Sequence, residues 1–175
     1  MNTKECRIVL YGNSILRTKT AEVKEITHDV RKVIEDLKRT LILKNGLGLA
    51  ANQIGSSLRI FCYNSEYFNL GPGPVVIINP EIVHKEGTYE SEEACLSLPG
   101  ITEVVARAQK VTVRGLSENG QELIVSGSDL LARVFQHEID HLNGILFIDY
   151  LSPLRKKMLK KELDEIIKLA QKQCE

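Results

Sequence analysis

The segment from Asp129 to Asn143 constrains the fold more than any other, because it combines helical spacing with apolar residues on most sides. Its apolar positions are Leu130, Leu131, Val134, Phe135, Ile139 and Leu142. Gly144 follows directly, as expected where a helix ends. A helix that is apolar nearly all round is expected to be buried. The remainder of the chain must therefore enclose this helix.

The same predicted helix carries a polar cluster, His137-Glu138-Ile139-Asp140-His141. Residues four apart share one face of a helix, so both imidazoles can reach one metal ion. Glu138 is the next residue of the helix after His137, where its side chain can contact a metal-bound water without being a ligand. A simple polar patch of two histidines fits poorly, because polar groups on a buried helix are costly without a role. The pattern therefore predicts a metal site with Glu138 as its acid or base.

Two histidines leave a catalytic metal one protein ligand short. A third histidine at the spacing known from some zinc proteases is excluded, because Phe147 occupies that position. Glu162 lies farther along, on a lysine-rich segment where a solvated face is the simpler interpretation. Cys95 lies in a loop-like segment between predicted strands, and a lone cysteine by itself indicates only a small buried side chain. These residues alone leave Cys95 and Glu162 open as the third ligand.

A glycine-containing segment, Gly46 to Gly55, follows the first predicted helix. By themselves, Gly46 and Gly48 would indicate only a helix cap and a turn. A phosphate-binding loop is disfavoured, because no Lys-Ser or Lys-Thr follows. Glycine also permits the close approach of a ligand, and Gln53 offers an amide donor for a developing oxyanion.

The other elements indicate a single α+β domain covering residues 1–175. We expect antiparallel or mixed β-sheets packed around the central buried helix, with an N-terminal helix over 27–45 and a C-terminal helix over about 153–173. Thr27 is the predicted N-cap of the first helix, and Asn45-Gly46 its end. The C-terminal helix has a predicted apolar stripe of Leu154, Met158, Leu163, Ile166, Ile167 and Ala170. Short strands are expected over 58–63 and 75–79, and a hairpin turns at 117–120.

Composition excludes several classes of protein. The 23 Lys and Arg residues balance the 23 Asp and Glu residues, so there is no overall attraction to nucleic acid or acidic membranes. No apolar run approaches the roughly 20 residues of a membrane span. The N-terminus does not resemble a secretory signal, so we expect a cytoplasmic protein. The four cysteines form no close pair and are expected to be reduced thiols.

Taken together, three segments resemble the motifs of the peptide deformylase family. The motifs GxGxAAxQ, EGCLS and HExDH match Gly46–Gln53, Glu93–Ser97 and His137–His141 in the same order. The resemblance extends from the Leu16-Arg17 region to about Tyr150. The chain departs from the pattern twice: Ala94 replaces the middle glycine of EGCLS, and Asn52 stands where many members have proline.

This resemblance implies a complete set of site residues. Cys95, His137 and His141 would hold one divalent metal ion per chain, with water in the fourth position. Glu138 would act first as general base and then as acid, and Gln53 with the backbone N–H of Leu96 would form the oxyanion hole. The substrate backbone would be held by Leu47, Gly48 and Ala94. A thiolate ligand suits Fe(II) or Zn(II); the family is known for Fe(II), with Zn(II), Ni(II) and Co(II) as possible substitutes.

The implied reaction removes the formyl group from the N-terminal formyl-methionine of nascent polypeptides and releases formate. The expected partners are these N-formylmethionyl peptides, met at the ribosome, with no direct nucleic-acid contact, no membrane and a monomeric chain. One rival is a small zinc peptidase with Glu162 as third ligand. The other is a non-enzymatic metal-binding module. Such a module would need a fourth protein ligand, and none adjoins the motifs of this chain.

Four further expectations concern the surroundings of the site. Leu130 and Val134 should line an apolar substrate pocket, because they share the His137 side of the helix. The head of Arg133 should reach the rim of that pocket. Glu93 should hold the segment of the third ligand in place, with Arg107 as its candidate partner. Ala94 is expected to have a negative φ.

Overall fold

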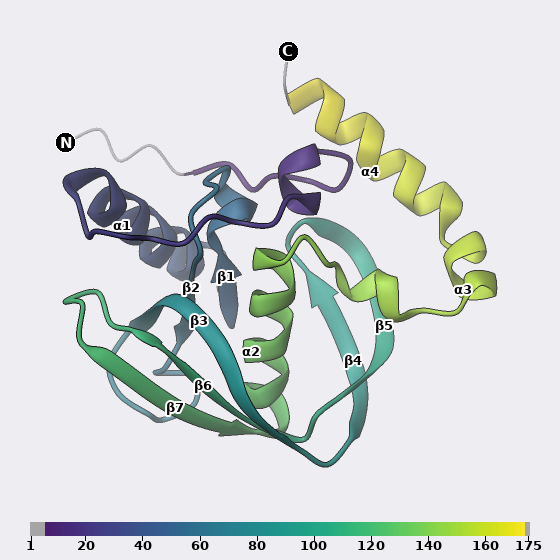
Figure 1. Cartoon of the computed structure of the whole chain (residues 1–175). Coiled ribbons are helices and arrows are strands. Elements are labelled where there is room, and N and C mark those ends of the chain that lie inside the picture. The colour runs from purple at the N-terminus through teal and green to yellow at the C-terminus, as the bar shows by residue number, and fades with distance from the viewer. Residues whose placement is uncertain (1–5, 174–175) are drawn as a thin grey trace.

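Two antiparallel sheets enclose one helix in the computed structural model, which describes residues 6–173 (Figure 1). The five-stranded sheet has the order β1-β2-β3-β6-β7, and β4 pairs with β5 in a separate two-stranded sheet. The strands are β1 (Gly48–Ala50), β2 (Ile60–Asn64), β3 (Pro74–Glu86), β4 (Tyr89–Cys95), β5 (Leu98–Arg107), β6 (Lys110–Leu116) and β7 (Glu122–Ser128). The helices are α1 (His28–Leu43), α2 (Asp129–Leu142), α3 (Pro153–Met158) and α4 (Lys160–Gln173), with short 3-10 turns η1 (Ser14–Arg17), η2 (Ala51–Ile54) and η3 (Phe147–Tyr150). The expected α+β class is confirmed.

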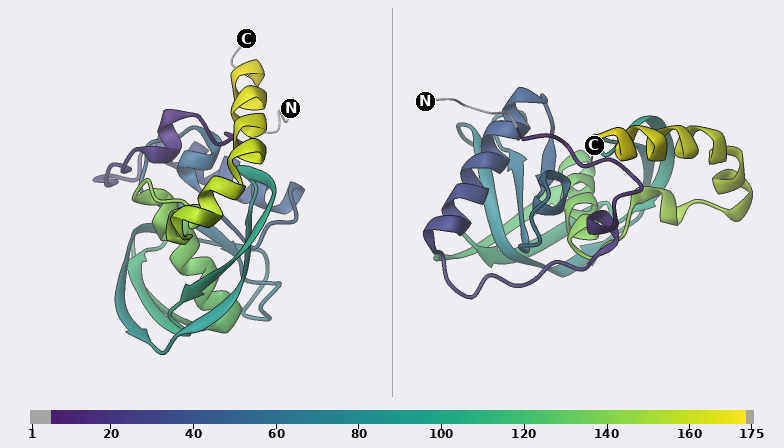
Figure 2. Two further views of the ribbon diagram at one scale, coloured as in Figure 1. Left: turned by 90° about the vertical axis from the view of Figure 1, so that its right-hand side faces the viewer. Right: turned by 90° about the horizontal axis from the view of Figure 1, so that it is seen from above.

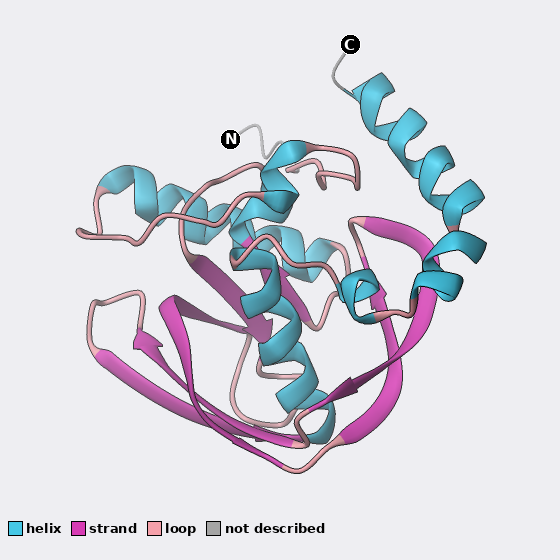
Figure 3. Ribbon diagram, turned by 45° about the vertical axis from the view of Figure 1, so that its right-hand side comes forward, coloured by secondary structure: helices cyan, strands magenta, loops and turns pink. Residues whose placement is uncertain are grey.

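Helix α2 is the centre of the molecule, as its sequence predicts. It lies between the two sheets (Figure 3), and nearly all of its residues from Leu131 onward are buried. Its apolar side chains pack with the inner face of the five-stranded sheet, including Phe61, Tyr63 and Ile77. Tyr63 meets the ring of Phe135 edge-on, with ring centroids 5.0 Å apart. This packing fixes the direction in which the polar cluster of α2 points.

Helix α1 covers the other side of β2 and β3. Thr27 is its N-cap, as predicted, and its side chain accepts a hydrogen bond from Val30 N. At the other end the prediction needs a correction, because Asn45 rather than Gly46 adopts the left-handed conformation, with φ of 50°. Asparagine adopts the left-handed conformation more readily than most residues, so Asn45 can end the helix. Gly46 then belongs to the segment that leads into β1.

The C-terminal helix expected over 153–173 is two helices. Ser152 caps α3 by accepting a hydrogen bond from Arg155 N. The helix is then interrupted at Leu159, and α4 begins at the next residue. Because the helical period is interrupted there, the predicted stripe does not continue across the break. Leu154 and Met158 are 70% and 60% exposed, whereas Leu159 packs in the core with Ile166.

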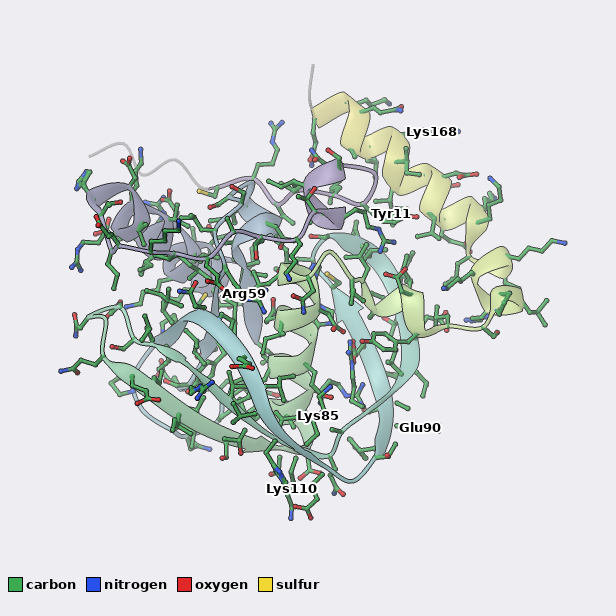
Figure 4. The ribbon with its side chains drawn as sticks, viewed as in Figure 1. Tyr11, Arg59, Lys85, Glu90, Lys110 and Lys168 are labelled. Atoms are coloured by element: carbon green, nitrogen blue, oxygen red, sulfur yellow. The ribbon has the colours of Figure 1, made fainter. Side chains whose placement is uncertain are left out.

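The two ends of the described chain lie together. The N-terminal segment runs beside α4 (Figure 2), where Arg7 donates to the carbonyl of Gln173 at 2.9 Å. Arg59, labelled in Figure 4, reaches from the start of β2 to the end of α2 and donates to Asn143 Oδ1 at 2.9 Å. Within residues 6–173, no helix has the length and apolar character needed to cross a bilayer.

Candidate active site

Three side chains that can bind a metal meet where β4 ends against α2. The ligand atoms of Cys95, His137 and His141 all lie within 4.8 Å of one another. Cys95 Sγ is 3.2 Å from His141 Nε2. Cys95 is the last residue of β4, not part of a loop as its sequence suggested, and a short turn then leads into β5. The strand therefore carries the thiol to the helix that presents both imidazoles.

The chemistry of this group fits a divalent transition metal. His137 Nδ1 is hydrogen-bonded to Glu93 Oε2 at 2.9 Å, which leaves Nε2 free to bind a metal. One thiol with two imidazoles is a donor set that suits Fe(II) or Zn(II) rather than Mg²⁺ or Ca²⁺. Glu162, the alternative third ligand, is exposed on α4 and does not belong to the group. The site therefore combines three protein donors, as catalytic metal sites do.

Glu138 lies beside the three donors and is 4% exposed. Burial raises the pKa of its carboxyl to about 7, with a further contribution from the charge of Glu93, while His137 acts in the opposite direction. Within the described part of the chain, its Oε2 has no hydrogen-bond partner. A carboxylate with one free oxygen and a pKa near neutrality is suited to accept and return a proton.

Gly48 allows β1 to pass directly against this carboxylate. A Cβ at residue 48 would lie 2.6 Å from Glu138 Oε1 and 2.7 Å from Val134 Cγ1, closer than side chains pack. Glycine is therefore needed here for close approach, not for a positive φ.

The amide of Gln53 is directed at the same place. Its Oε1 accepts from Ala50 N at 2.9 Å, which fixes the orientation of the amide. Its Nε2 then faces Cys95 Sγ at 3.5 Å and Ser97 Oγ at 3.2 Å. Leu96, between these two residues, is half-buried and borders the same space. A polarised substrate oxygen near the thiol would meet a preoriented N–H donor.

A cavity of about 410 Å³ opens beside these groups. The residues expected to bind substrate all border it: Leu47, Gly48, Ala94, Leu130, Arg133 and Val134. Leu98, Ile101 and Thr102 of β5 border it as well, and the sequence alone did not indicate them. Ala94 lies in β4 and is not among the residues of positive φ, in agreement with expectation.

Arg133 borders the cavity, as expected, but it is 3% exposed and its head is held by buried partners. Its guanidinium donates to Glu93 Oε1 at 2.7 Å, to Val105 O at 2.9 Å and to Tyr89 O at 2.8 Å. A buried cation needs a partner, and the buried Glu93 supplies it.

The predicted pairing of Glu93 with Arg107 is confirmed. Arg107 Nε and Nη2 donate to the two oxygens of Glu93 at 2.7 and 3.0 Å. Arg107 also pairs with Asp140 of α2, which accepts from the hydroxyl of Tyr150 at 2.9 Å. Burial alone would raise the pKa of Glu93, but the hydrogen bonds from His137 and Arg107 lower it well below its usual range. Glu93 is therefore a carboxylate that orients His137.

Comparison with known proteins gives one consistent result. The sequence model of the family described as polypeptide deformylase matches residues 5–157. A peptide deformylase of Thermodesulfovibrio yellowstonii is 42% identical over 152 residues, which is 87% of this chain and 92% of the relative. One from Pseudoalteromonas translucida is 43% identical over 165 residues, 94% of this chain and 97% of the relative.

The architecture agrees with this result. The crystal structure of a peptide deformylase from Legionella pneumophila superposes with a TM-score of 0.87 at 40% identity, covering 95% of this chain and 97% of that one. Sequence, fold and the cluster of one thiol and two imidazoles point the same way, and the chain belongs to the peptide deformylase family.

Proposed function

We propose that Cys95, His137 and His141 hold one divalent metal ion, and that Glu138 moves the proton in the reaction of this family. That reaction removes the formyl group from the N-terminal formyl-methionine of nascent polypeptides. The observation that supports this assignment most strongly is the 4.8 Å cluster of three donor atoms beside a buried carboxylate with a free oxygen. Fe(II) is the proposed native ion, with Zn(II), Ni(II) and Co(II) as substitutes.

A metal at this site would lower the pKa of a water molecule toward neutrality. Glu138 accepts the proton of the attacking water through Oε2 and later returns it to the departing amine, leaving formate. Gln53 Nε2, held by Ala50 N, donates to the formyl oxygen as negative charge develops on it. We assign the second donor to the backbone N–H of Leu96.

We further propose that the substrate lies along the cavity wall formed by Leu47, Gly48 and Ala94, with the methionine side chain toward Leu130 and Val134. β4 pairs only with β5 among the described strands, so its other edge can accept an extended peptide as an added strand. The proposed setting is the cytoplasm, with nascent chains met at the ribosome by a monomeric enzyme.

The test is Glu138→Gln, measured as formate release from a formyl-methionyl peptide. The amide has nearly the same shape but cannot accept the proton, so activity should fall by at least about 10²-fold. Metal content, determined after anaerobic purification, should stay near one ion per chain and would also identify the native metal. Normal turnover by this variant would contradict the assigned role.

A second pair of variants tests the ligand set. Cys95→Ser should lose the metal, because an alcohol is a much weaker ligand than a thiolate for these ions. Glu162→Gln is the matched control and should retain it, since this side chain is exposed on α4. The reverse outcome would favour a zinc peptidase with Glu162 as ligand.

A further inference from the structure

Asn52 makes an unusual contact with one of the proposed metal ligands. It lies in η2, is fully buried, and donates from Nδ2 to the backbone carbonyl of His141 at 2.5 Å. His141 lies in the last turn of α2, where carbonyls have no partner in a further turn of helix. Gly144 N also donates to this carbonyl, at 3.0 Å. The side chain of Asn52 therefore adds a bond to a carbonyl that backbone N–H groups at the end of α2 already contact.

The next residue along η2 is Gln53, and it contacts a different ligand. Its Nε2 faces Cys95 Sγ at 3.5 Å and Ser97 Oγ at 3.2 Å. Cys95 belongs to β4 and His141 to α2, two elements that come from distant parts of the chain. Two consecutive amide side chains of one short turn thus contact both elements that carry the metal donors.

We propose that Asn52 is a positioning residue that fixes η2, and with it the oxyanion donor Gln53, relative to His141. The inference rests on the proposed function, because it concerns the same site. A hydrogen bond weakens steeply as its donor and acceptor move apart or as its angle departs from linearity. A small shift of η2 would therefore weaken the hydrogen bond that Gln53 donates. The same shift would loosen the last turn of α2, which holds the His141 ring in place.

A simpler role for Asn52 would be to cap the end of α2 and add only to stability. Thr20 provides a matched control for that role. It is also buried, and its Oγ1 donates to the carbonyl of Leu142, the next residue of α2, at 2.9 Å. Thr20 contacts neither a proposed ligand nor η2 through this bond. Removing its hydroxyl therefore reports what the loss of one buried cap bond does at this end of the helix.

The experiment compares Asn52→Leu with Thr20→Val in the full chain. Each variant is measured for melting temperature without metal, for release of bound Ni(II) to a chelator, and for kcat and KM of formate release. Both should melt at similarly lower temperatures. Only Asn52→Leu should release Ni(II) faster and lose kcat, each by about tenfold, with KM unchanged, because a disturbed outer contact of a metal ligand typically has that effect.

Asn52→Ala, which removes the amide without adding bulk, replaces Asn52→Leu if the latter does not fold. Wild-type Ni(II) release and kcat in an Asn52 variant that folds would overturn the proposal. Equal changes in Thr20→Val would also overturn it and leave Asn52 as an ordinary cap. If the unmodified protein released no formate, the proposed function would fail, but Ni(II) release would still test whether Asn52 holds His141.

Discussion

Gly48 borders the proposed substrate cavity and lies directly against Glu138, the proposed proton carrier. A methyl group there would overlap Glu138 Oε1 and Val134 Cγ1. Overpacking of this kind costs about 1–3 kcal/mol when neighbours must move. The neighbour here is the carboxylate itself, so the first effect of the added methyl should be a displaced Glu138.

We therefore expect Gly48→Ala to lower kcat strongly while the metal content stays normal. The check is formate release together with metal analysis. Gly46→Ala is the control, because its added methyl would meet Leu41 Cδ1, the end of a side chain, at 2.9 Å rather than Glu138. If both variants lost activity equally, the close approach of β1 to Glu138 would not be the reason for glycine at residue 48.

Sequence patterns predicted which residue types form the candidate site better than they predicted how those residues are arranged in space. His137, Glu138 and His141 follow from helical spacing alone, but no local pattern could bring Cys95 to them, because that contact depends on how β4 packs against α2. The family resemblance supplied it instead. For Arg133 the spacing correctly indicated the side of the helix that faces the cavity. It could not indicate the direction of the head, because the partner Glu93 lies on another element.

At the scale of elements, Arg107 connects the two-stranded sheet to α2. Its guanidinium pairs with Glu93 of β4 and with Asp140 of α2, and its side chain is 4% exposed. Glu93 in turn orients the ring of His137. Removing one member of a buried ionic group leaves the others without compensation and costs about 3–5 kcal/mol.

Arg107→Ala should therefore lower stability and weaken metal binding by about 10–100-fold, since it disturbs the residue that orients a ligand. Metal affinity is measured by titration of the metal-free protein, and stability by denaturant unfolding. Arg114→Ala is the control, because Arg114 pairs with Glu81 on the surface, where both side chains are more than half exposed. Unchanged metal affinity in Arg107→Ala would show that Glu93 orients His137 without this support.

Element boundaries were predictable where a local cap determines them. Thr27 and Ser152 begin helices as expected, because their side chains pair with the free N–H groups of the first turn. The break at Leu159 was not predictable. The segment contains no glycine or proline there, and the break serves the packing of Leu159 beside Ile166 and Phe147, which is a tertiary requirement. Strand pairing between β3 and β6 likewise joins segments whose partners local sequence does not specify.

At the scale of the whole molecule, the proposed metal would add a further link between the two-stranded sheet and α2, which Arg107 and Glu93 already connect. Cys95 comes from the two-stranded sheet, and His137 and His141 come from the helix that packs on the five-stranded sheet. The unfolded chain does not hold Cys95 near the two histidines, so it binds the ion poorly. An ion that binds only the folded state stabilises that state. The free energy gained grows with the ratio of the free ion concentration to the dissociation constant.

At a thousandfold excess this linkage gives about 4 kcal/mol, which for a chain of this size raises the melting temperature by about 8–16 °C. We expect wild-type protein loaded with Ni(II) to melt higher than metal-free protein by an amount in this range. Cys95→Ser should show almost no shift at the same Ni(II) concentration, whereas Glu162→Gln should shift like the wild type, because Glu162 lies exposed on α4 away from the three donors. The difference between these two variants separates binding at the cluster from binding elsewhere on the surface. An equal shift in Cys95→Ser and wild type would mean that the stabilising ion does not need the thiol, and the cluster would then not be the metal site.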